Sequence, residues 1–187
     1  MAQTLTDRVK AIKNTPGTGE AVLVSEINAA FDKFDNHFIP MCKIQGNAAQ
    51  NITSGAGQVP IGYDTIRIDT YAARSEGAMA DLSNDRIIIR KAGLYYLKVN
   101  TLWLAGTAAG ILRLDMAVNG TTDLSNFDNG EAQATSQEIS QYRILAPGDL
   151  ITAFVQQTTG ALRTLDDNTY ANINCLEVVW MGSATEV

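Results

Sequence analysis

KAGLYYLKVNTLWL, residues 91–104, opens on the turn residues Ala92-Gly93 and continues as a run of aliphatic, aromatic and β-branched side chains. LAPGDLITAFVQ, residues 145–156, repeats this order behind Pro147-Gly148. Glycine and proline favour turns, whereas the residues that follow them favour the pleated, half-buried surface of a strand. The two stretches therefore predict turn-then-strand units of an antiparallel β fold.

The cleanest alternation in the chain lies between these units. Leu112, Leu114, Met116 and Val118 alternate with polar or small residues, and the run ends at Asn119-Gly120. A period of two predicts a half-buried strand, and the Asn-Gly pair predicts a tight turn after it. With this run and its two flanking units, the candidate strands are residues 59–61, 65–71, 86–90, 94–104, 111–119, 138–146, 150–157, 162–165 and 171–181.

Short strands at these spacings predict a mainly β fold, an antiparallel two-sheet jelly-roll sandwich. The small and polar residues 46–57 are expected to form a loop. Residues Thr121–Gln137 form the longest polar stretch, and they are expected to be an exposed loop as well.

The N-terminal region has a different period. Apolar residues recur at spacings of three and four as far as a stop at Pro40, at Val24, Ile27, Phe31, Phe34 and Phe38. This is a heptad seam of about two heptads, and a helix of that length is marginal in water unless its apolar stripe packs against something. The stripe could pack on its own β body or against other copies of the chain. The predicted organisation is a short α-helical arm for attachment and oligomerisation, residues 1–40, and a β-sandwich head, residues 41–187.

Length and charge exclude several classes of protein. A chain of 187 residues can bury a core without disulfides or metal. The net charge is −6 and the basic residues are scattered, which argues against nucleic acid as a partner. No run of about 18 apolar residues occurs, so membrane insertion is not expected, and residues 1–13 lack the apolar core of a secretory signal. Synthesis in a cytoplasm is the expectation.

Residues for catalysis or for binding a cofactor are sparse. His37 is the single histidine, and it lies at the end of the predicted helical arm. Cys42 and Cys175 stand in apolar surroundings that favour free, buried thiols over a bridge, and one histidine with two cysteines gives no zinc-finger spacing. The carboxylate pair Asp166 and Asp167 is of a kind that any acidic sequence offers. We therefore expect no enzymatic activity, no cofactor and no metal.

Calcium is the cation that the acidic stretches of the chain could bind. Residues 81–85 and 123–131 supply carboxylates, but neither follows the EF-hand spacing, so ordinary solvated loops are the simpler interpretation.

Three motifs resemble the superfamily of complement globular heads and tumour necrosis factors. They are Ala92-Gly93-Leu94-Tyr95-Tyr96, Leu145 to Leu150 with its Pro-Gly-Asp turn, and the closing strand Tyr170 to Trp180, within a region of similarity that spans about residues 43–182. The resemblance implies a jelly-roll head that forms a homotrimer with aromatic and aliphatic side chains in the interface. It marks a possible head interface at Tyr95, Tyr96, Phe154 and Trp180.

The arm resembles the start of many small bacteriophage tail and fibre proteins at Ser25 to Asp35. Together the two resemblances imply a phage virion structural protein of the minor tail, tail-tip or fibre type, made in the host cytoplasm and docked onto other virion proteins through residues 1–40. Its candidate exposed contact residues for host cell-surface glycans are Asp123, Phe127 and Asp128. The alternatives are a capsid decoration or head-fibre protein at three-fold positions, a non-enzymatic carbohydrate-binding module, and a glycan depolymerase that would use Asp166 and Asp167.

Overall fold

The computed structural model describes residues 39–130, 133–166 and 174–183. The chain divides after Phe38, and every described residue belongs to the unit that begins at Ile39. The predicted helical arm and its seam, Val24, Ile27, Phe31, Phe34 and Phe38, lie outside the described residues. The helix and its role in oligomerisation therefore stay predictions.

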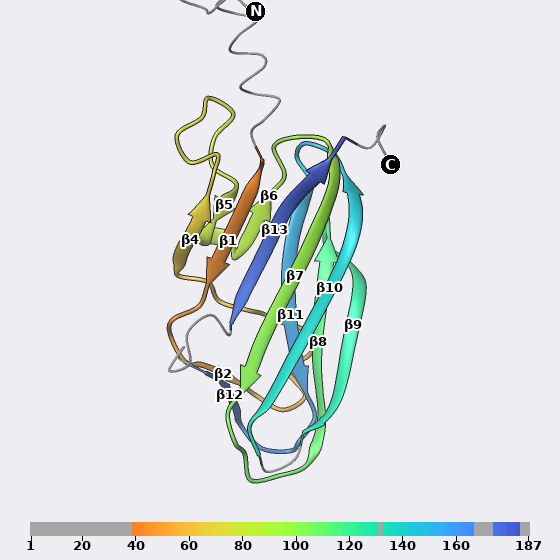
Figure 1. Ribbon diagram of the computed structural model, residues 1–187. Helices are drawn as coiled ribbons and strands as arrows, with labels where there is room; N and C mark the ends of the chain where they lie inside the picture. Colours follow the sequence, from red (N-terminus) through yellow and green to blue (C-terminus); the bar gives the residue numbers. More distant parts are fainter. Residues whose placement is uncertain (1–38, 131–132, 167–173, 184–187) are drawn as a thin grey trace, which may run out of the picture. The chain divides into compact units, whose positions relative to one another are not determined.

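The described residues form two antiparallel sheets (Figure 1). We call the seven-stranded one the large sheet. Its centre is β7, which pairs with β10 and with β13, while β13 pairs with β1 and β1 with β4. A short strand, β12, pairs with the end of β7 on one side and with β2 on the other. The strands are β1 (Met41–Gln45), β2 (Gln50–Ile52), β4 (Thr65–Asp69), β7 (Gly93–Trp103), β10 (Thr135–Leu145), β12 (Arg163–Leu165) and β13 (Cys175–Gly182).

The six-stranded sheet is called the small sheet below. It runs in the order β5-β6-β11-β8-β9, with β3 paired to β11. Its strands are β3 (Val59–Pro60), β5 (Ala80–Asp81), β6 (Arg86–Ile88), β8 (Gly110–Val118), β9 (Thr121–Gly130) and β11 (Leu150–Gln157), and a 3-10 turn, η1 (Leu82–Asn84), joins β5 to β6.

The core lies between the inward faces of the two sheets. Along β7 every second residue is buried, and the same alternation runs along β11. The largest buried side chain, Trp103 of β7, donates its indole Nε1–H to Gln137 Oε1 of β10 at 2.8 Å, so its one polar atom is satisfied. Strands with one buried and one outward face are what the period-two runs predict. The predicted jelly-roll sandwich is confirmed.

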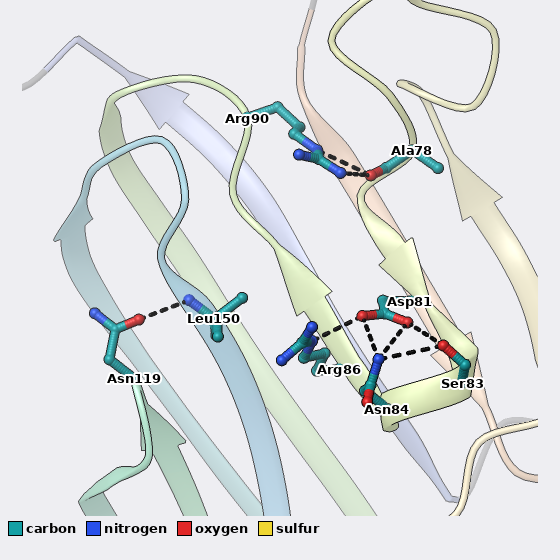
Figure 2. Close-up of polar contacts among 8 residues, drawn as sticks. All are labelled: Ala78, Asp81, Ser83, Asn84, Arg86, Arg90, Asn119 and Leu150. Atoms are coloured by element: carbon teal, nitrogen blue, oxygen red, sulfur yellow. Dashed lines mark hydrogen bonds and ion pairs between the residues drawn. The ribbon is translucent and has the colours of Figure 1, made fainter.

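The two turns predicted at Asn119-Gly120 and at Pro147-Gly148 lie side by side. Asn119 and Gly120 both take positive φ, 53° and 77°, as a tight hairpin turn requires. The Asn119 side chain then reaches the Pro147-Gly148 turn, where its Oδ1 accepts from Leu150 N at 2.9 Å (Figure 2). Its Nδ2 donates to Asp149 Oδ1 at 2.8 Å. The two turns that the sequence marks therefore stabilise each other.

The prediction of an exposed loop at Thr121–Gln137 is wrong. Residues 121–130 form β9, paired with β8 along its length, and β10 begins at Thr135. An edge strand can be polar on both faces because one of its sides meets solvent, and this polarity makes it look like a loop. The loop expected at residues 46–57 is likewise interrupted, by the short strand β2.

Candidate functional site

At one end of the large sheet β7 begins and β10 and β13 end (Figure 1). The outward face of the sheet carries an apolar surface at this end. The register places Tyr142 opposite Tyr96 and Ile144 opposite Leu94, so these four side chains lie on one face of the sheet. Tyr142 and Ile144 are 65% and 62% exposed. We call this surface the apolar end patch and define it as Leu94, Tyr96, Tyr142, Ile144, Val179 and Met181.

Contacts within the patch hold its side chains in place. The Tyr96 and Tyr142 ring centroids are 5.3 Å apart with a tilt of 50°, a geometry that aromatic pairs favour. Val179 lies opposite Tyr96 on the other side of β7, and Met181 stands in the irregular register that ends β13, 52% exposed. Clustered, ordered apolar side chains of this kind mark interaction sites more often than scattered ones do.

A line of alternating charge borders the patch on the same face. Lys98 Nζ lies 2.9 Å from Glu138 Oε2, and Lys43 Nζ lies 3.7 Å from Glu177 Oε2. Glu177 is also the register partner of Lys98, so the sign alternates across β10, β7, β13 and β1. The hydrogen bond that Lys98 donates to Glu138 is the main cause of the raised pKa of Lys98. The face thus has an apolar end and a charged border.

The described chain begins at the end of the sheet that carries the patch. Ile39 is 53% exposed, Trp180 N donates to Pro40 O at 2.8 Å, and Met41 pairs with Val179 of the patch. The first described residue, Ile39, therefore lies beside the apolar end patch.

The four residues marked as a head interface do not share one exposed surface, although Trp180 lies opposite Tyr95 in the register of β13 and β7. Tyr95 is fully buried in the sandwich, where its hydroxyl donates to Lys91 O at 2.7 Å and burial raises its pKa. Trp180 is half-buried; its Nε1 donates to Ala92 O, and Lys91 Nζ lies 4.2 Å from its ring centroid.

Phe154 is half-buried on β11 of the small sheet, so it lies on the other sheet. Of the four, Tyr96 alone belongs to the apolar end patch. The sequence reasoning missed Tyr142 and Ile144, although both fall on the alternate face of a strand that it had predicted.

The three marked contact residues also separate. Asp123 is half-buried, accepting from Gln141 Nε2 at 2.6 Å and forming an ion pair with Arg143, so it ties β9 to β10. Phe127 and Asp128 are exposed, and with Ile111 and Asn129 they line a surface hollow of about 480 Å³ on the small sheet. Two of the three therefore share a surface.

The acidic stretch at residues 81–85 is occupied by its own side chains (Figure 2). Asp81 accepts from Ser83 Oγ at 2.7 Å, from Asn84 Nδ2 and from Arg86 Nε at 2.8 Å, and the bond from Ser83 is the main cause of its lowered pKa. Asp85 accepts from Tyr63 N at 2.7 Å. These carboxylates thus accept hydrogen bonds from side chains of the same turn and from the main chain of Tyr63.

Other candidate chemistry can be placed within the described ranges. Cys42 and Cys175 are buried and no disulfide joins them, as expected, and burial raises the pKa of both thiols. Among the described residues, no three His, Cys, Asp or Glu side chains gather as metal ligands would. Within those same ranges no helix is both long and apolar enough to cross a bilayer. Asp166 is buried at 1% exposure, whereas Asp167 lies outside the described residues.

Comparison with known proteins places the fold. No protein-family model and no curated protein matches the chain. Among solved structures, the Eiger TNF of S. frugiperda is similar with a TM-score of 0.56 at 15% identity, over 78% of this chain and 94% of that one. The globular domain of zebrafish complement 1qA is similar with a TM-score of 0.50 at 13% identity, over 77% of this chain and 98% of that one. The described body therefore has a jelly-roll fold of the kind seen in TNF and in the complement C1q globular domain.

Proposed function

We propose that this chain is a non-enzymatic structural protein of a bacteriophage virion, whose β body is the head of a homotrimer docked through residues 1–40. The observation that carries the proposal is the apolar end patch. Three of its side chains, Tyr142, Ile144 and Met181, are more than half exposed in the single chain. Covering them in an assembly removes apolar surface from water, at about 25 cal/mol for each Å² buried.

The layout around the patch supports an interface between copies. Interfaces place an apolar, aromatic centre inside a polar border, and here the line from Glu138 to Lys43 supplies that border. A face that carries both signs of charge in alternation can meet another copy of itself without net repulsion. The likeness of the fold to the TNF and C1q globular domains is consistent with this assembly.

The predicted helical seam fits the same assembly. Its residues Val24 to Phe38 precede the point where the body begins, and that point lies beside the apolar end patch. A three-fold axis that buries the patch would therefore bring the starts of three arms together, where an a/d seam can pack.

A double substitution tests the assembly. Tyr142→Ser with Ile144→Ser removes the two most exposed patch side chains, and we expect sedimentation velocity to show dissociation of the full chain at micromolar concentration. Leu162→Ser, which changes a 57% exposed residue outside the patch, is the matched control and should leave the assembly intact. Equal behaviour of the two variants would contradict a role for the patch.

Incorporation into particles tests the virion role. With residues 1–40 removed, the head should fold but be absent from purified phage, whereas the full chain should be present. Copy number separates the two virion locations: a few trimers indicate the tail tip or a fibre, and hundreds of copies indicate capsid decoration. Particles that carry the truncated chain at the normal level would contradict docking through the arm.

A further inference from the structure

We propose that the hollow beside Phe127 on the small sheet binds a neutral pyranose unit of an oligosaccharide. This inference deepens the proposed function, and it rests on that function for the source of the sugar, a glycan of the host surface. The hollow is open to solvent, is lined by Ile111, Phe127, Asp128 and Asn129 and has a volume of about 480 Å³. That volume suits a small ligand of one or two sugar rings.

The shape of the hollow follows from the register of β8 and β9. Phe127 lies opposite Arg113, and Asn129 lies opposite Ile111, so the ring, the amide and the Ile111 side chain share one face at the end of the hairpin. Phe127 is 61% exposed and Ile111 is 47% exposed. The pair presents an apolar floor with an amide beside it.

A buried network holds the floor in place. The Arg113 guanidinium lies over the Phe127 ring, 5.1 Å from its centroid. Arg113 Nε donates to Asp115 Oδ1 at 2.7 Å, and Asp115 is fully buried and also accepts from Gln58 Nε2 at 2.7 Å. An exposed aromatic side chain that is fixed before binding loses less rotamer entropy when a ligand arrives. The platform is therefore preorganised.

The groups around the platform match the chemistry of a sugar. A pyranose has an apolar face of C–H groups, which can lie on an aromatic ring, and hydroxyls at its rim, which can form hydrogen bonds with an amide. Phe127 supplies the ring and Asn129 supplies the amide at the rim, while Asp128 pairs with Leu112 and lines the hollow from the position between them. The hollow is open to solvent, so it offers no deep pocket for the side chain of a peptide.

Charge selects the class of sugar. Arg113 is balanced by Asp115, so Asp128 leaves the surroundings of the hollow with a negative charge, and the whole chain carries a net charge of −6. A sialylated or uronic sugar would meet repulsion there, whereas a neutral one would not. The preferred ligand is therefore neutral.

The test is titration of the full chain with defined sugars. The probes are the methyl pyranosides of glucose, galactose, mannose, rhamnose and N-acetylglucosamine, short neutral oligosaccharides of each, and 3′-sialyllactose. Amide chemical shifts in a ¹⁵N spectrum are the readout. We expect at least one neutral sugar to give saturable shifts at Ile111, Phe127 and Asn129, and 3′-sialyllactose to give weaker ones.

Two variants make the test specific. Phe127→Ala should weaken binding about tenfold or more, as loss of an anchoring aromatic does, and Asn129→Ala checks the site independently if that variant fails to fold. Ile66→Ala, a change at a 46% exposed residue on β4 of the large sheet, is the control and should bind as the wild type does. Absence of saturable shifts with every probe, or binding that survives both hollow variants, would overturn the inference. Neither outcome changes the oligomeric state or the particle incorporation that test the proposed function.

Discussion

Asp115 is a fully buried carboxylate whose charge is balanced by the Arg113 guanidinium at 2.7 Å. Gln58 and Ser125 add donors to the same carboxylate. Removing the cation leaves a buried anion without its counter-charge. The resulting loss of folding stability is larger than the stability that an exposed ion pair contributes. Arg113→Met should therefore lower the free energy of unfolding by about 3 kcal/mol in urea titrations. Arg113→Met with Asp115→Leu should recover part of that loss, and a double variant less stable than the single one would contradict the account.

Lys98 and Glu138 make a weaker, partly exposed pair whose contribution depends on pH. Because Glu138 raises the pKa of Lys98, the pair contributes fully below the ordinary lysine value of 10.5 and is lost as the pH rises through the higher folded value. Glu138→Gln should lower the free energy of unfolding by less than about 1 kcal/mol near pH 8 and by a smaller amount near pH 12. Denaturation of both proteins at the two pH values measures the difference, and a gap that widens with pH would contradict the sign.

At the scale of the element, β7 depends on the glycine that opens it. Gly93 takes φ 154°, and a Cβ at this position would lie 2.1 Å from Trp180 Nε1 and 2.4 Å from Gly182 O. Gly93→Ala should therefore cost about 3 kcal/mol, since backbone and a packed indole must both move. Gly120→Ala is the matched control, because its φ is 77° but nothing lies within 4 Å; it should cost about 1 kcal/mol. Thermal unfolding measures which of the two variants is less stable. Equal losses of stability would mean that backbone conformation alone, and not the clash with Trp180 and Gly182, accounts for the effect.

The sequence predicts some elements well because burial shapes their residue pattern. β7, β8 and β11 each bury one face against the core, and the period of two is visible in their letters. β9 lies at the edge of the small sheet and is polar on both faces, so it was expected to be a loop. The strands β2 and β5, of three and two residues, are too short to show a period.

The candidate surfaces follow the same rule. A motif can mark a strand without telling which of its aromatics faces out: of the neighbours Tyr95 and Tyr96, the first is in the core and the second in the apolar end patch. Tyr142 becomes visible as its partner only when the β7–β10 register is known. The polar neighbours of Phe127 in the sequence mark it as a candidate contact residue. The Arg113–Asp115 network beside its ring involves β8, β9 and Gln58, and no local sequence pattern reveals contacts between segments so far apart.

At the scale of the molecule, the two surfaces lie on different sheets. The apolar end patch is built on β7, β10 and β13, and the hollow is built on β8 and β9. Changes at one should leave the other intact, so Phe127→Ala is expected to keep the assembly of the wild type. Sedimentation velocity checks this expectation, and dissociation of Phe127→Ala would place the hollow in the subunit interface and not on a free surface.

The most direct test of the central claim is the molar mass of the full chain in solution, measured by light scattering across a range of concentrations. The account predicts a homotrimer, with about three times the 20.1 kDa of one chain. A monomer that persists at high concentration would contradict it, because the apolar end patch would then be exposed with no copy of the chain to cover it.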